Sequence, residues 1–63
     1  MRVRIEFNEE KLENYGKVMA TLSPYILTIY RSGRGYIELE LSDDAVTLLN
    51  DLNKLDRIKI IEM

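Results

Sequence analysis

The feature that most constrains the fold is a glycine-containing turn between two strand-like stretches, within the segment YILTIYRSGRGYIELEL at residues 25–41. Residues 25–31 are rich in β-branched and aromatic side chains, and residues 36–41 alternate apolar and acidic side chains, as strands do. The turn at residues 32–35 supplies the glycines that a tight reversal of the chain needs. The segment therefore predicts a β-hairpin. Its second strand has one clear apolar face, whereas its first strand carries large side chains on both faces.

Two further strands and two helices flank this hairpin. Residues 1–7 and 57–63 alternate apolar and polar side chains, which predicts strands. Apolar residues at helical spacing predict one helix between residues 8 and 22 and another between residues 42 and 55. The side chains expected to face the sheet are Leu12, Tyr15, Met19 and Leu22 in the first helix and Ala45, Leu48, Leu49, Leu52 and Leu55 in the second.

The residues at the helix ends agree with these boundaries. Asn8 and Ser42 stand at N-cap positions, and each precedes two acidic residues that suit the positive end of a helix dipole. Pro24 ends the first helix, because a residue before proline is displaced from the α region. Gly16 costs this helix about 1 kcal/mol relative to alanine, and we expect it to allow a close approach to the sheet.

The order of elements, βαββαβ, is that of the split βαβ ferredoxin-like folds. A chain of 63 residues allows one domain, so we assign residues 1–63 to a single domain. We predict an α+β fold with a four-stranded antiparallel sheet in the order 4-1-3-2 and two helices on one face. The other face, called the open face below, is then left without helices.

The composition excludes most catalytic and metal chemistry. The chain has no cysteine and no histidine, so it has no thiolate metal ligand and no imidazole base. Carboxylate catalysis needs an acid that is desolvated, and no acidic residue is marked by the sequence as buried. We therefore expect a protein that is not an enzyme and that has no cofactor and no metal site.

The charge pattern bears on location and partners. The net charge is −2 with both signs interspersed, which is typical of a soluble surface and argues against nucleic acid as a partner. No apolar run approaches the roughly 20 residues that span a membrane. The alternating residues 1–7 do not resemble a targeting peptide. We expect a cytoplasmic location and no membrane association.

Two turn lengths compete in the hairpin, and they place opposite sets of side chains on the open face. A two-residue loop at 33–34 pairs Ile29 with Glu38, whereas a three-residue loop at 33–35 pairs Ile29 with Leu39. The longer loop also places a glycine at the left-handed position of a G1 bulge. Because a slip of one residue moves every side chain to the other face, we predict the longer loop, which buries the apolar residues.

The predicted register leaves an apolar border on the open face. It pairs Leu27 with Leu41 and turns Ile26, Thr28 and Tyr30 outward. Their strand is an edge of the predicted sheet, and an apolar edge is a template for pairing with another chain. We therefore predict association with a protein partner, most simply a second copy related by two-fold symmetry. The candidate contact residues are Ile26, Thr28, Tyr30 and Tyr36, with Arg31 at the rim.

A ladder of opposite charges is expected at the centre of the open face. Antiparallel pairing of the first and third strands places Arg2 near Glu40 and Arg4 near Glu38. Cross-strand pairs of opposite charge contribute roughly 0.2–1 kcal/mol each. The middle of the open face is therefore expected to be polar, in contrast to its border.

Weak binding of nucleic acid is an alternative function. The tripeptide Arg34-Gly35-Tyr36 resembles the opening of the RNP1 motif, whose aromatic side chains stack on RNA bases. Glu38 stands where that motif has a second aromatic residue, and Arg4 stands where the first strand would supply another. Only Tyr36 then remains as a stacking surface.

Three families of proteins resemble the predicted order of elements. Heavy-metal-associated domains share the order but require a CxxC motif, and the amino-acid-sensing ACT and RAM domains share it and dimerise through their sheets. The stretches RVRIEF and LTIYRSGRGYIELEL resemble the small dimerising subunit of the KEOPS tRNA-modification complex, which implies an accessory subunit of an RNA-modification complex. The closing stretch RIKIIEM is not part of that family's pattern. A designed scaffold is a further interpretation, because cysteine, histidine, tryptophan and glutamine are all missing.

Overall fold

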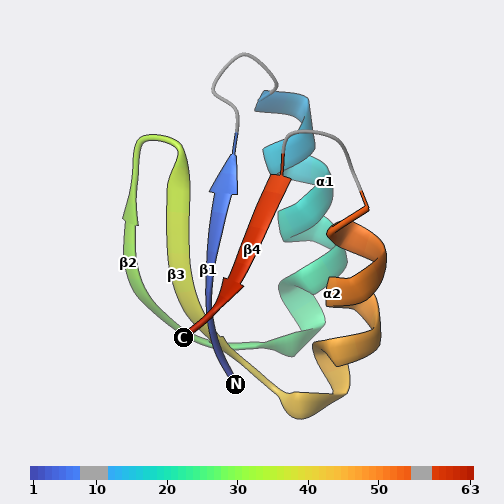
Figure 1. Cartoon of the computed structure of the whole chain (residues 1–63). Coiled ribbons are helices and arrows are strands. Elements are labelled where there is room, and N and C mark those ends of the chain that lie inside the picture. Colours follow the sequence, from blue (N-terminus) through green and yellow to red (C-terminus); the bar gives the residue numbers. More distant parts are fainter. Residues whose placement is uncertain (8–11, 55–57) are drawn as a thin grey trace.

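A computed structural model of the chain describes residues 1–7, 12–54 and 58–63 (Figure 1). Its elements are, in order, β1 (Arg2–Phe7), α1 (Leu12–Leu22), β2 (Ile26–Gly33), β3 (Tyr36–Leu41), α2 (Val46–Leu52) and β4 (Ile58–Glu62). Short 3₁₀ helices at Ser23–Tyr25 and Asp43–Ala45 lead into β2 and α2 respectively. The predicted order βαββαβ is confirmed.

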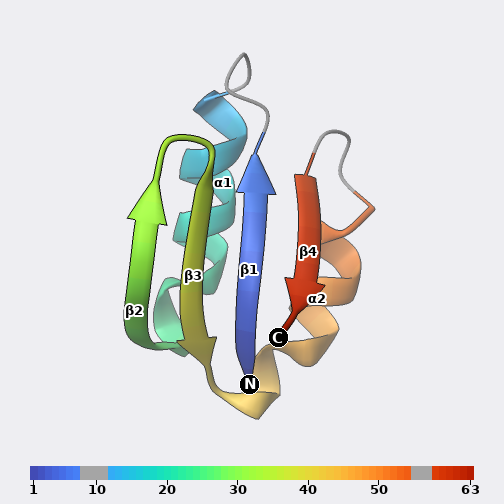
Figure 2. The ribbon, with the colours of Figure 1, turned by 60° about the vertical axis from the view of Figure 1, so that its left-hand side comes forward.

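The four strands form one antiparallel sheet in the order β2-β3-β1-β4. This is the predicted order counted from the opposite edge, so β2 and β4 are the two edges. Figures 1 and 2 show both helices on the same side of the sheet, and the opposite side faces the viewer in Figure 2. The predicted α+β architecture with an open sheet is therefore present.

The core lies between the sheet and the helices. Its side chains come from alternate positions of β1, β3 and β4, as the apolar alternation predicts, and from one side of each helix. The buried apolar residues are Val3, Ile5, Val18, Leu22, Ile37, Leu39, Leu41, Ala45, Leu49, Leu52 and Ile58.

Two expectations about α1 are wrong. Tyr15 is 42% exposed and not part of the core, whereas Val18 is fully buried with Leu22, four residues later. The buried pair lies over the sheet, while Tyr15 lies nearer the end of the helix that meets the hairpin, where its ring packs edge-on against Phe7. A Cβ atom added at Gly16 would meet no atom within 4 Å, so this glycine allows no close approach to the sheet.

The predicted helix ends are partly confirmed. Helix α1 ends at Leu22, immediately before the 3₁₀ helix that contains Pro24. Ser42 stands at the N-cap position before Asp43, but its side chain makes no capping hydrogen bond. Its backbone carbonyl accepts a hydrogen bond from the Ala45 N–H at 3.0 Å instead. The predicted cap at Asn8 lies outside the described residues.

The turn of the hairpin is shorter than predicted. The strands continue until Gly33 lies opposite Tyr36, which leaves a two-residue loop of Arg34 and Gly35 and makes the predicted three-residue loop wrong. Gly35 has the left-handed conformation that was predicted, with a φ of 83°. Residues with a Cβ rarely adopt this conformation, so a glycine suits the position.

Strand β2 carries one extra residue at two places. Leu27 is extra between the pairs Ile26–Leu41 and Thr28–Glu40, and Tyr30 is extra between the pairs Ile29–Leu39 and Arg31–Glu38. Each bulge sets two residues of β2 against one of β3 and shifts the alternation of faces. The pairing of Ile29 with Leu39 is therefore confirmed, whereas the predicted pairing of Leu27 with Leu41 is wrong.

The bulges also correct the predicted orientation of Ile26. With Leu41 as its partner, Ile26 turns towards the helices and packs against the core, so its predicted outward position is wrong. Leu27 and Ile29, which were expected to be buried, are 65% and 52% exposed. Of the large apolar side chains that β2 presents to solvent, Tyr30 was predicted, whereas Leu27 and Ile29 are exposed in place of Ile26.

Candidate interaction surface

The centre of the open face is built around a buried carboxylate. Glu38 on β3 is only 3% exposed, although both helices lie on the other side of the sheet. The expectation that the chain marks no buried acid is therefore wrong. Arginines on the neighbouring strands β1 and β2 approach the carboxylate, and this lateral cover cannot be read from the sequence around Glu38 itself.

Three guanidinium groups contact the Glu38 carboxylate. Arg4 Nη1 donates a hydrogen bond to Glu38 Oε2 at 3.3 Å, and Arg31 Nε lies 3.7 Å from the same oxygen. Arg2 Nη2 lies 4.0 Å from Glu38 Oε1. Buried charges are stable only when they are paired, and this one is paired from both sides. The predicted contact of Arg4 with Glu38 is confirmed, whereas Arg2, the register partner of Glu40, contacts Glu38 instead.

Two of these arginines also lie over tyrosine rings. The guanidinium carbon of Arg2 is 4.3 Å from the centre of the Tyr30 ring, and that of Arg4 is 4.2 Å from the centre of the Tyr36 ring. Cation–π contacts of this kind contribute about 0.5–1 kcal/mol at exposed sites. Arg2 and Arg4 therefore each contact both the Glu38 carboxylate and a tyrosine ring, and these shared contacts fix the positions of the side chains on the open face.

Glu40 is the second paired carboxylate of β3 on the open face. The Met1 ammonium lies 2.5 Å from Glu40 Oε2, and the Tyr30 hydroxyl donates a hydrogen bond to Glu40 Oε1 at 3.0 Å. The hydrogen bond from the ammonium, followed by that from Tyr30, lowers the pKa of Glu40. The same hydrogen bond to Glu40 raises the pKa of Tyr30, because losing the phenolic proton would place two negative oxygens together.

The border formed by β2 has a different character from the centre. None of its eight residues is buried, and its large apolar side chains Leu27, Ile29 and Tyr30 are 65%, 52% and 45% exposed. Its one charged residue is Arg31. We call Leu27, Ile29 and Tyr30 the β2 border. It is the place on the described surface where exposed large apolar side chains gather most closely along one strand.

The predicted contact residues differ in how exposed they are: one packs inward, three are exposed and one is partly buried. Ile26 packs inward, whereas Thr28 is exposed opposite Glu40. Tyr30 and Arg31 are exposed near β3, and Tyr36 is partly buried beneath Arg4. The structure thus brings Thr28, Tyr30 and Arg31 to the border or beside it and removes Ile26 from it.

Leu27 and Ile29 were missed as contact candidates, because both were expected to be covered by the helices. Leu27 is displaced by a bulge, whereas Ile29 pairs with Leu39 as predicted but remains 52% exposed at the edge of the sheet. One signal was present in the sequence. The large apolar residues of this edge strand fall in two adjacent pairs, Ile26–Leu27 and Ile29–Tyr30, so one member of each pair faces away from the core in any regular register.

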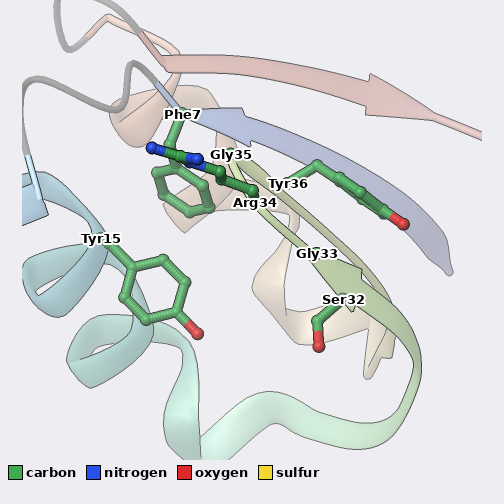
Figure 3. Close-up of a pocket in the computed structure, with 7 residues that line it drawn as sticks. All are labelled: Phe7, Tyr15, Ser32, Gly33, Arg34, Gly35 and Tyr36. Atoms are coloured by element: carbon green, nitrogen blue, oxygen red, sulfur yellow. The ribbon is translucent and has the colours of Figure 1, made fainter.

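A hollow lies at the turn end of the hairpin. It has a volume of about 550 Å³, and its lining residues are Phe7, Tyr15, Ser32, Gly33, Arg34, Gly35 and Tyr36. Figure 3 shows Phe7, at the end of β1, beside Tyr15 on α1, with the hairpin across from them. We call this hollow the hairpin pocket.

Within residues 1–7, 12–54 and 58–63, no three histidine, cysteine or acidic side chains come close enough to hold a metal ion. Neither described helix is both long enough and apolar enough to cross a bilayer.

Comparisons with protein-family models, with curated proteins and with solved structures gave no match to this chain. Its function is therefore inferred from its own geometry.

Proposed function

We propose that the chain is a non-enzymatic interaction module of ferredoxin-like fold that associates with a second copy of itself through β2. The observation that supports this is the exposure of Leu27 and Ile29 on an edge strand, at 65% and 52%. Complete burial of such a side chain contributes about 1.5–3 kcal/mol. A domain with a core of this size gains proportionately more from burying them than a larger domain would.

The charge distribution along β2 favours a second copy as the partner. A two-fold axis near the middle of the strand would place two β2 strands antiparallel, with the apolar border of each copy against that of the other. Arg31 lies towards one end of the strand, so the two copies of this charge would be separated. The neighbouring acids of the open face, Glu38 and Glu40, are already paired within the chain.

The two bulges limit the form of this contact. Because they interrupt the regular spacing of the ladder, a long run of backbone hydrogen bonds between two β2 strands is not expected. The contact would rest mainly on side chains. Three apolar residues per copy cover less than the roughly 800 Å² per partner of a standard interface, so we expect a weak dimer with a dissociation constant that is micromolar or higher.

Sedimentation velocity over micromolar to millimolar protein tests this proposal. The wild-type chain is expected to change from monomer to dimer with concentration, and Ile29→Glu is expected to remain monomeric. Val46→Glu is the matched control, because Val46 is 49% exposed but lies on α2. Tyr30→Glu is a less clean variant, since it places a carboxylate beside Glu40. A wild-type chain that remains monomeric throughout, or a loss of association in Val46→Glu alone, would contradict the proposal.

Weak nucleic-acid binding, alone or as an accessory subunit of an RNA-modification complex, is the second candidate. The gathering of Arg2, Arg4 and Arg31 on the open face favours it, since arginines contact phosphate. Against it, these arginines share Glu38, and two of them already cover the tyrosine rings on which bases would stack. Fluorescence anisotropy with single-stranded RNA at low salt separates the two candidates. For either function we expect a cytoplasmic location.

A further inference from the structure

The two glycines that line the hairpin pocket differ in their surroundings. A Cβ atom added at Gly33 would lie 2.5 Å from Cε1 of Tyr36, so the Tyr36 ring lies across the backbone where a side chain would otherwise be. Gly35 completes the turn in a left-handed conformation. Because Tyr36 covers Gly33, the backbone that a flat group in the pocket could approach closely is that of Gly35, which carries no side chain.

The opposite side of the pocket is aromatic. The rings of Phe7 and Tyr15 lie 5.0 Å apart between centres at an angle of 64°, in an edge-to-face arrangement. Tyr15 remains 42% exposed, so this pair is not sealed into the core. Figure 3 shows the two rings next to each other, with the Arg34 side chain passing across the Phe7 ring in this view. A third ring inserted there would find aromatic surface on one side and peptide backbone on the other.

Polar groups are few and lie at the margin of the pocket. They are the hydroxyl groups of Tyr15 and Ser32 and the guanidinium of Arg34. Small-molecule sites commonly measure about 300–1,000 Å³ and combine apolar or aromatic walls with a few polar groups that fix orientation. The hairpin pocket has this size and this make-up.

We propose that the hairpin pocket binds a small planar aromatic molecule that carries a carboxylate. The ring lies between the Phe7–Tyr15 pair and the glycine backbone, and the carboxylate lies towards Arg34. Aromatic contacts contribute about 0.5–1.5 kcal/mol beyond area burial, which corresponds to a preference of roughly two- to tenfold over a saturated ring of similar size. The pocket lies at the turn end of the hairpin and shares no residue with the β2 border, so it does not depend on dimer formation.

Titration of the ¹⁵N-labelled chain with two matched probes tests this site. Indole-3-acetate supplies a planar ring with a carboxylate, and cyclohexanecarboxylate supplies a carboxylate on a saturated ring. Indole-3-acetate is expected to give saturable shifts of the amides of Phe7, Tyr15 and the turn residues, and to bind roughly two- to tenfold more tightly than the saturated acid. Equal affinities, or no saturable shift at these amides at millimolar probe, would overturn the proposal.

Substitutions locate the site and separate its two parts. Tyr15→Leu keeps an apolar side chain against Phe7 but removes the ring, so it is expected to reduce the preference for indole-3-acetate over cyclohexanecarboxylate. Val46→Leu is the control, because Val46 lies on α2 and does not line the pocket. Arg34→Gln is expected to weaken indole-3-acetate but not indole-3-carbinol, which has no carboxylate. An unchanged preference in Tyr15→Leu would refute the aromatic part of the proposal, and equal weakening of both indole probes in Arg34→Gln would refute the part that concerns charge.

Discussion

Strands β2 and β3 are neighbours in one hairpin, yet they differ completely in burial. Four of the six residues of β3 are buried and the other two are partly buried, whereas none of the eight residues of β2 is buried and seven are exposed. β3 has a strand on each side, and β2 forms an edge and bulges twice. Pairing with β3 therefore satisfies only the inner side of the β2 backbone, and side chains are buried only where neighbouring strands and helices also cover them.

The sharpest difference is expected between two leucines of this hairpin. Leu39 on β3 is fully buried, so Leu39→Ala is expected to lower the free energy of unfolding by about 2–5 kcal/mol, a large part of the stability of a small domain. Leu27 on β2 is 65% exposed, so Leu27→Ala is expected to change it by no more than about 0.5 kcal/mol. Urea unfolding at low protein concentration measures both values. Similar losses in the two variants would show that β2 is as well buried as β3.

The next largest effect is expected at the Glu38 cluster. Glu38→Gln removes the charge that three arginines share and is expected to cost about 1.5–3 kcal/mol, the usual contribution of a hydrogen bond to a charged group. Arg31→Gln is the matched change on β2, where the arginine side chain is 68% exposed, and it is expected to cost less than about 1 kcal/mol. Added salt should stabilise Glu38→Gln more than the wild type, because it screens the unpaired arginines. Equal costs for the two variants would contradict the central role of Glu38.

Alanine substitutions at two glycines are expected to change the stability of the chain by smaller amounts and in opposite directions. Gly33→Ala is expected to displace the Tyr36 ring from its contact with Arg4 and to destabilise the chain by about 1 kcal/mol. Gly16→Ala adds a methyl group that meets nothing within 4 Å on an exposed part of α1, and it is expected to stabilise the chain by about 0.5–1 kcal/mol. Thermal unfolding of both variants shows whether each substitution lowers or raises the stability of the chain. A stabilising Gly33→Ala would mean that Tyr36 does not lie across the hairpin backbone.

The smallest effect is expected in the pH dependence of the link between Tyr30 and Glu40. The pKa of Glu40 is lowered in the folded chain, so its contribution to stability is present above the pKa of the unfolded carboxyl group and is lost as pH falls through the folded value. The pKa of Tyr30 is raised, so its contribution is lost as pH rises through the folded value.

Tyr30→Phe removes one donor to Glu40 and removes the phenol. We therefore expect the pKa of Glu40 to rise and the alkaline loss of stability that belongs to Tyr30 to disappear. Carboxyl-carbon NMR of Glu40 and urea unfolding over a pH series measure the two effects. An unchanged Glu40 pKa in Tyr30→Phe would show that the hydrogen bond does not form in solution.

The same contrast explains what could be predicted from the sequence. In β1, β3 and β4 the apolar residues alternate regularly, so the buried sides and the pairing of Arg2 with Glu40 follow from a period of two residues. In β2 large apolar residues stand next to each other, at Ile26–Leu27 and at Ile29–Tyr30, so neither face is distinctly apolar and the strand does not fix its own register. The bulges at Leu27 and Tyr30 set the register, and no residue of β2 marks them in advance; Ile29 keeps its predicted partner Leu39 but is exposed at the edge of the sheet.

Two parts of the surface needed three-dimensional information. The burial of Glu38 depends on arginines from β1 and β2, which approach only once the sheet is formed. The hairpin pocket depends on Tyr15, which helical spacing assigned to the core. Sequence patterns identified the elements, their order and the pairing of Arg4 with Glu38, but they did not identify the contacts of Glu38 with Arg31 or of Tyr15 with Phe7.

The central claim is that β3 is an interior strand and β2 is a contact surface for a second copy. Isotope-filtered NOE spectroscopy on a mixture of ¹³C-labelled and unlabelled chains at millimolar concentration tests it most directly. We predict intermolecular NOEs from the methyl groups of Leu27 and Ile29, and none from the buried Leu39. Intermolecular NOEs that arise only from Val46 or Met63, or no intermolecular NOEs at all, would contradict the account.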